Sequence, residues 1–376
     1  MIDFRSVSRE FRGLVDRRQE LFMFLGSAFA AMGLFLQNVL QGGLPASLAP
    51  VQEHLFAFYA AVLMVVSLIL ALRMSRLHSG MIINGVLYAR LMQEQDFARK
   101  GDPRRAARHN FLGVSFVQFL LANLIAFFST AILCLALSAH ILAAAGIGAV
   151  VFAVGLYCYL RFHREGAALA FRRIETERCA PFSREDWEEH ISECLQQSSR
   201  GLLAEIAFAG LMVFSGFEAL SGLGQISLAG PTDLTPADVT RYGPLVYGVL
   251  MTVSCLLELV VYLRVRVAIG SFSLQLDPTD RPFRAMQLSD SFLGYTLLAF
   301  LFAVSLHVLL TLAVPALGAR QGLLLAISAA ALLLALAAEQ ATLAWARRRF
   351  GPPAPEVATP RAAEPQGGEP GKAEQG

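Results

Sequence analysis

The stretch VLMVVSLILAL (residues 62–72) decides the fold, because it returns as VLMTVSCLLEL at residues 249–259. Seven of the eleven positions are identical. Two unrelated membrane helices would share about two, through their common bias toward Leu, Val and Ala. We therefore interpret the chain as two tandem copies of one membrane unit.

Shorter echoes follow in the same order along the chain. SRE at 8–10 returns at 183–185, AFA at 28–30 returns at 207–209, and FLG at 111–113 returns at 292–294. Their order places the boundary between the copies near residue 180. We expect a first unit at 1–178, a second unit at 179–350, and a tail at 351–376 whose Pro, Gly, Ala, Glu and Gln composition predicts disorder.

The composition is that of a membrane protein. Hydrophobic residues make up 55% of the chain, and they gather in runs of about 20 residues, the length that crosses a hydrocarbon core of about 30 Å. We expect an all-α, polytopic transmembrane helical bundle with four spans in each unit. The eight expected spans are 21–40, 55–72, 111–137, 141–160, 202–223, 244–263, 292–314 and 322–345.

The fourth span is rich in small residues. Ala144 and Gly148, and also Ala149 and Ala153, stand four positions apart. Small residues at this spacing let helix backbones approach closely. We therefore expect the fourth span to lie inside the bundle.

The distribution of Lys and Arg predicts the orientation. If the spans alternate, 29 of the 31 basic residues fall on the side that carries both termini, and only Arg241 and Arg320 fall on the other. The positive-inside rule then places both termini in the cytoplasm and the protein in the cell (inner) membrane. Because each unit has an even number of spans, the two copies form a parallel repeat. This topology accounts for the arginine excess, so no nucleic-acid partner is expected.

Each unit is preceded by an amphipathic helix that we expect on the cytoplasmic side. In residues 4–18, Phe4 and Phe11 belong to an apolar face among arginines, and before the second unit Trp187 and Ile191 form a similar stripe. Such helices either lie in the lipid headgroup layer or pack against other cytoplasmic helices of the same chain.

Ionisable side chains inside spans are costly and mark candidate functional positions. They are concentrated in the second unit, where the candidates for a transport or polar site are Glu218, Glu258, His307 and Glu339. Glu258 takes the place that Ala71 holds in the first copy.

The depths of these residues in their spans predict two levels. Glu258 and Glu339 lie in the cytoplasmic third and are expected to share one polar site, whereas Glu218 and His307 lie toward the outside. Together they would suit a proton or cation route. The alternatives are structural pairing with arginine or tyrosine, or binding of a lipid or quinone headgroup. Glu205 is placed at the cytoplasmic mouth of its span, where a carboxylate needs no special partner.

The sequence carries no motif of an enzyme or a cofactor site. It has no P-loop, G-x-S-x-G or H-E-x-x-H motif, so we expect no enzymatic activity. A bis-histidine haem needs two histidines inside the bundle, and only His307 is placed there. The five cysteines form no C-x-x-C pair. We expect neither a cofactor nor a metal.

Three functions are compatible with these features. The first is a channel or carrier for a small ion or solute, with a polar site in the second repeat. The second is a membrane scaffold or signalling subunit that binds a partner through its cytoplasmic amphipathic helices. The third is a membrane anchor subunit of a larger redox or secretion complex. The expected partners are the lipid bilayer and a second copy of the chain or a cytoplasmic protein.

Overall fold

The computed structural model describes residues 1–40, 52–94, 102–104, 106–107, 113–137, 139–229, 237–276 and 290–350. Apart from one short bridge between Ile2 and Cys179, the regular structure of this part is helical. The helices are α1 (Phe4–Leu40), α2 (Gln52–Gln93), α4 (Val114–Ala136), α5 (Ile141–Thr176), α6 (Arg184–Ala229), α7 (Ala237–Leu276), α9 (Asp290–Ala313), α10 (Pro315–Gly318) and α11 (Gln321–Phe350). The expected tail at 351–376 and the start of the third span at 111–112 lie outside the described residues.

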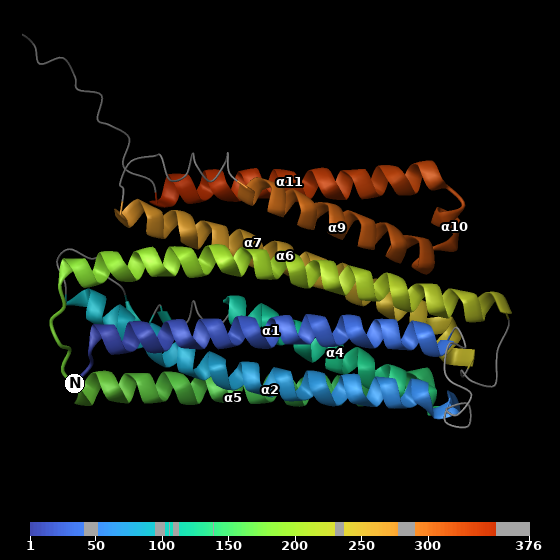
Figure 1. Ribbon diagram of the computed structural model, residues 1–376, viewed down its shortest axis with the longest axis horizontal. Coiled ribbons are helices and arrows are strands. Elements are labelled where there is room, and N and C mark those ends of the chain that lie inside the picture. The colour runs from blue at the N-terminus through green and yellow to red at the C-terminus, as the bar shows by residue number, and fades with distance from the viewer. Residues whose placement is uncertain are drawn as a thin grey trace, which may run out of the picture.

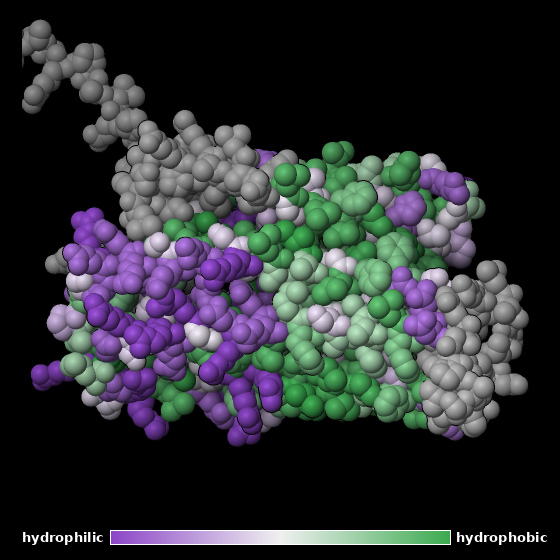
Figure 2. Space-filling view, in the orientation of Figure 1, coloured by the Kyte–Doolittle hydropathy of each residue, from purple (hydrophilic) through white to green (hydrophobic). Residues whose placement is uncertain are grey.

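The long helices lie roughly along one axis (Figure 1). In this view α1 and α6 run through the middle, α2 and α5 lie on one side, and α9 and α11 lie on the other. On the face shown in Figure 2, one half along this axis is mostly hydrophilic and the other mostly apolar. We call the hydrophilic half, which contains the N-terminus, the polar end.

The polar end exists because several helices, among them α1, α2, α5 and α6, are much longer than a membrane is thick. Helices α1, α2, α5 and α6 contain 37, 42, 36 and 46 residues. At about 1.5 Å per residue, each exceeds the roughly 30 Å of a hydrocarbon core. Their charged portions continue past the apolar runs and form the polar end together.

Among the described residues, seven helices are long and apolar enough to cross a membrane, by length and composition. These helices are α2, α4, α5, α6, α7, α9 and α11, and they contain the second to the eighth expected spans. Helix α1, which contains the first expected span, is not among them. The chain therefore has the architecture of a multi-pass helical membrane protein.

Helices α1 and α6 form the longest contact between the two halves of the chain. The rings of Phe22 and Phe208 stack with their centroids 3.9 Å apart, and Ser215 Oγ donates a hydrogen bond of 2.9 Å to the carbonyl oxygen of Phe29. Gly33 permits this approach, because a Cβ there would lie 3.0 Å from the carbonyl oxygen of Ser215.

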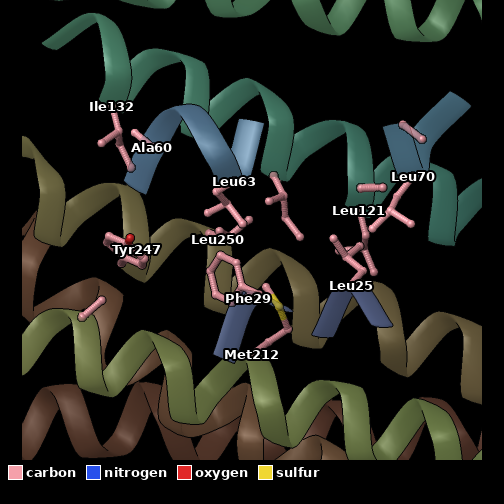
Figure 3. Close-up of a cluster of buried hydrophobic side chains, with 14 of the residues drawn as sticks. Leu25, Phe29, Ala60, Leu63, Leu70, Leu121, Ile132, Met212, Tyr247 and Leu250 are labelled. Atoms are coloured by element: carbon pink, nitrogen blue, oxygen red, sulfur yellow. The ribbon is translucent and has the colours of Figure 1, made fainter. Parts of the chain in front are cut away.

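Six helices, α1, α2, α4, α5, α6 and α7, contribute to one apolar core, part of which is drawn in Figure 3. Its side chains include Leu25 and Phe29 of α1, Leu63 of α2, Leu121 of α4, Met212 of α6 and Leu250 of α7. Farther from the polar end, the buried hydroxyls of Tyr59 and Tyr247 form a hydrogen bond of 2.6 Å. This bond joins α2 to α7.

Helix α5 lies at the edge of the bundle, so the expectation that the fourth span lies inside it was wrong. Only 17% of the apolar 18-residue stretch of α5 is buried inside the protein. Ala144 and Gly148 are buried, but Ala149 and Ala153 are exposed. A Cβ at Gly148 would lie 3.0 Å from the carbonyl oxygen of Phe127 on α4. The small residues Ala144 and Gly148 therefore lie on the buried face of α5, where Gly148 allows close contact with α4, whereas Ala149 and Ala153 lie on its exposed face.

The amphipathic segments pack against each other within the chain. Residues 4–18 are the first turns of α1 and not a separate helix. Phe4, Trp187 and Ile191 are 1%, 6% and 0% exposed and belong to one apolar cluster, and Phe11 is partly buried. Of the two arrangements considered for these segments, the structure has packing inside the protein.

Candidate functional site

Glu205 is held at the centre of a buried polar cluster. It lies on α6 and is only 2% exposed. From α4, Gln118 Nε2 donates a hydrogen bond of 2.6 Å to Glu205 Oε1. From α1, the buried guanidinium of Arg18 interacts electrostatically with Glu205 and donates a hydrogen bond of 3.3 Å to Ser115 Oγ. The expectation that Glu205 needs no partner was therefore wrong.

Glu258 of α7 completes this cluster. Its side chain is fully buried, and its carboxyl group lies within hydrogen-bonding reach of the Glu205 carboxyl group. In the described part of the chain, neither oxygen of Glu258 accepts a hydrogen bond from an N–H or hydroxyl group. Two carboxyl groups can hydrogen-bond to each other only when one carries a proton. We call Arg18, Gln118, Glu205 and Glu258 the carboxyl cluster.

The charges of the carboxyl cluster favour a proton over a metal ion. With one proton shared between Glu205 and Glu258, the remaining negative charge is balanced by Arg18, and the buried cluster is neutral. A metal cation would have to lie beside the guanidinium, and like charges repel. No group of three His, Cys, Asp or Glu side chains suited to a metal ion occurs among the residues that the structure describes.

Glu339 has a different partner. It forms an ion pair with Arg266 of α7, and both side chains are 0% exposed. Nearby, the Tyr295 hydroxyl donates a hydrogen bond of 3.0 Å to the carbonyl oxygen of Ala335. The expected single site of Glu258 and Glu339 therefore divides into two, because Arg266 supplies Glu339 with its own counter-charge.

The two outer candidates make separate contacts. His307 Nδ1 lies 3.1 Å from Ser328 Oγ of α11. Glu218 is partly exposed on α6, and Ser215, one turn before it, donates to α1 instead. Within the described ranges, no hydrogen bond or ion pair joins Glu218 to His307. Their part in an ion route stays a prediction.

Outside the apolar half, ion pairs fix the helices of the polar end to one another. Arg5 of α1 lies 2.7 Å from Asp186 of α6. At the end of α5, Arg173 Nε donates a hydrogen bond of 2.9 Å to Glu177, which lowers the pKa of Glu177 to about 2. The Arg5–Asp186 pair thus joins α1 to α6 at the polar end.

Sequence reasoning missed three members of these buried sites. Arg18 was placed in the surface helix at 4–18, and Arg266 follows the expected end of its span at 263. Gln118 is a neutral side chain in the expected third span and was not among the ionisable candidates. A usable signal existed for Arg18 and Arg266, since an arginine that adjoins an apolar run is within reach of a carboxylate one or two turns inside it.

Comparison of the chain with protein-family models, with curated proteins and with solved structures gave no match.

Proposed function

We propose that this protein is an inner-membrane carrier that binds and releases protons at the pair Glu205 and Glu258. The observation that carries the proposal is the contact between two buried carboxyl groups on neighbouring helices, with Arg18 as their counter-charge. Asp, Glu and His side chains inside membrane spans form the proton relays of pumps and transporters. The proton is either the transported ion itself or coupled to a second solute.

The proposal includes the topology predicted from the arginines. Helix α1 is taken as the first of eight spans, both termini face the cytoplasm, and the two units are parallel repeats. The side-by-side packing of α1 and α6 supports this, because they are the first helices of the two copies. The polar end then lies in the cytoplasm.

The apolar core supports a carrier and not an open pore. Beyond the carboxyl cluster, Leu63, Met212 and Leu250 pack together (Figure 3), and Tyr59 bonds to Tyr247. A proton bound at the cluster cannot cross these side chains unless the helices move. Release on the far side therefore requires α1 and α2 to shift against α6 and α7. We assign no enzymatic activity to the protein.

Proton flux into vesicles tests this function. The purified protein is reconstituted into vesicles that enclose a pH-sensitive dye, and a pH gradient is applied. Glu205→Gln and Glu258→Gln should each reduce flux to that of empty vesicles. Glu188→Gln, a change of an exposed carboxylate on the same α6 helix, should keep the wild-type rate. Wild-type flux in both cluster variants would refute the assignment.

Infrared spectroscopy tests the shared proton without any transport. A protonated carboxyl group gives a carbonyl band that is separate from that of a carboxylate. We expect this band in the wild-type protein at neutral pH and its loss in the Glu205→Gln Glu258→Gln double variant. A band of equal intensity in both proteins would show that the pair holds no proton.

The scaffold or signalling function has one observation in its favour, the helical polar end outside the apolar half. The partner surface expected from the sequence, the apolar faces of the amphipathic helices, cannot serve, because Phe4, Trp187 and Ile191 are buried within the chain. A partner would have to bind the charged surface of the polar end. Co-purification that is lost on charge reversal at Arg9 and Arg172, with no measurable proton flux, would favour this function.

A further inference from the structure

Two histidines meet between α2 and α5, past the ends of their expected spans at 72 and 160. His78 Nε2 of α2 lies 3.1 Å from His163 Nδ1 of α5, a hydrogen-bonding distance between ring nitrogens. The His78 side chain is only 1% exposed, whereas His163 is partly exposed. A buried imidazole is therefore joined directly to one that reaches the protein surface.

The packing around this histidine pair holds its rings in place. The His78 ring stacks on that of Tyr159 with the centroids 4.4 Å apart, and Tyr159 is itself fully buried. Gly166 of α5 lets the two helices approach, because a Cβ there would lie 2.8 Å from the carbonyl oxygen of Ser79 on α2. The two imidazoles are thus kept against each other by contacts of both helices.

The buried histidine of the pair leads to the carboxyl cluster. The His78 imidazole is close enough to the Arg18 guanidinium for their charges to interact, and Arg18 interacts in the same way with Glu205. A second set of contacts agrees with this placement. Met81 follows His78 by three residues, so both lie on one face of α2, and Ser115 Oγ donates a hydrogen bond of 3.3 Å to the Met81 sulfur. The same Ser115 oxygen accepts the hydrogen bond from Arg18. His78 therefore lies beside the Arg18 side of the cluster.

The chemistry of these imidazoles suits the passage of a proton. In a neutral imidazole one ring nitrogen carries a hydrogen and the other accepts one. Burial lowers the pKa of His78, and the charges of His163 and Arg18 lower it further, to about 3. At neutral pH the His78 ring is therefore uncharged, and a proton that reaches it moves on instead of being held.

We propose that His163 and His78 form the relay through which protons pass between the polar end and the carboxyl cluster. This rests on the proposed function of the cluster as a proton-binding site. Uptake begins when the carboxyl pair has released its proton. A hydronium ion gives a proton to His163 Nε2, and the proton on His163 Nδ1 moves to His78 Nε2. The proton on His78 Nδ1 then passes through a water molecule to the carboxylate of Glu205 or Glu258. Each ring gains one N–H bond and loses one, so the net result is one proton added to the pair.

Exchange of the shared proton for deuterium tests the relay without transport. The purified full chain in detergent is moved from H2O to D2O, and infrared spectroscopy follows the carbonyl band of the protonated carboxyl group, which shifts on deuteration. His78→Phe keeps the stacking on Tyr159, and His78→Gln keeps a hydrogen-bonding group beside His163. Each should slow the exchange by roughly 100-fold, the effect of losing a positioned proton-transfer group. His54→Phe changes an exposed histidine at the start of the same helix and should exchange as the wild type does.

Rescue by free imidazole separates proton transfer from a structural role. His163→Ala leaves space at a partly exposed position, which imidazole from solution can enter, whereas His163→Phe fills that space. Proton flux into vesicles should be reduced in both variants. Added imidazole should restore flux in His163→Ala and leave that of His163→Phe unchanged.

The outcomes distinguish the relay from the proposed function. Equal exchange rates in the wild type and both His78 variants would overturn the relay and leave the carboxyl pair as a proton-binding site. Flux in His163→Ala that equals the wild-type rate, or that imidazole does not raise, would also overturn the relay. Absence of the carbonyl band from the wild type would overturn the proposed function and the relay with it.

Discussion

The buried pair of Arg266 and Glu339 gives the sharpest energetic prediction. Both side chains are 0% exposed, so removal of one partner leaves an uncompensated charge in the bundle. Such a loss costs about 3–5 kcal/mol. We expect this decrease in the free energy of unfolding for Arg266→Met and for Glu339→Leu alone. In the double variant no charge remains, and two apolar side chains of similar volume fill the space. Its stability should lie within about 1 kcal/mol of the wild type, or above it.

A double-mutant cycle measures this coupling. The four proteins are unfolded in mixed micelles by titration with a denaturing detergent, and the free energies are compared. If the two single effects simply added, the double variant would lose about 6–10 kcal/mol, which is most of the stability of an ordinary protein. That result would refute the idea that each residue serves mainly to neutralise the other. Proton flux of a folded double variant should equal that of the wild type, because the proposed proton site is the carboxyl cluster.

Three further changes test the packing and the charges. Gly155→Ala should lower the free energy of unfolding by about 1–3 kcal/mol, because its Cβ would lie 2.8 Å from Asn123 Cγ. In the control Gly146→Ala, the added Cβ meets nothing within 4 Å, so this variant should be as stable as the wild type or slightly more stable. Equal melting temperatures for the two variants would contradict the placement of this helix face. Trp187→Ala removes a side chain that is 6% exposed and should lower the free energy of unfolding by about 3–5 kcal/mol. The polar end of the variant should be cut by a protease faster than that of the wild type. Unchanged proteolysis would mean that the aromatic cluster is dispensable. Glu177→Gln tests a carboxyl group whose pKa is lowered from 4.5 to about 2 in the folded protein. Its contribution to stability is present above pH 4.5 and is lost as the pH falls through about 2, so the melting temperatures of wild type and variant should differ at pH 6 and converge near pH 2.

The apolar spans could be predicted from the sequence because the signal for each one is local. A run of about 20 apolar residues crosses a membrane whatever its neighbours are, and seven of the expected spans lie in helices that meet this criterion. The lengths of the polar extensions were less visible, since a charged amphipathic segment such as 4–18 can lie on a membrane or continue a helix. Burial of Phe4 against the stripe of Trp187 settles that choice through contacts that no single segment contains.

The position of the fourth span shows the limit of composition. Small residues predict a close helix contact, and Gly148 makes one with α4. The number of neighbours around the helix is a separate matter, because it depends on how many other helices compete for the same space. Helix α5 has close neighbours on one face only, and Ala149 and Ala153 are small residues on the open face.

The sequence by itself determined that this protein is a multi-pass helical bundle and which carboxylates lie within its apolar spans. Hydropathy and charge are properties of short segments, so both could be read without knowledge of the contacts. Only the tertiary structure decided which carboxylates meet. Arg18, Gln118, Glu205 and Glu258 come from four helices and converge through the rotation and tilt of each helix about its axis. Those angles are set by the packing of the whole bundle. The similarity of residues 249–259 to residues 62–72 drew attention to Glu258, which stands where the first stretch has Ala71, and the fold supplies Glu205 as its partner.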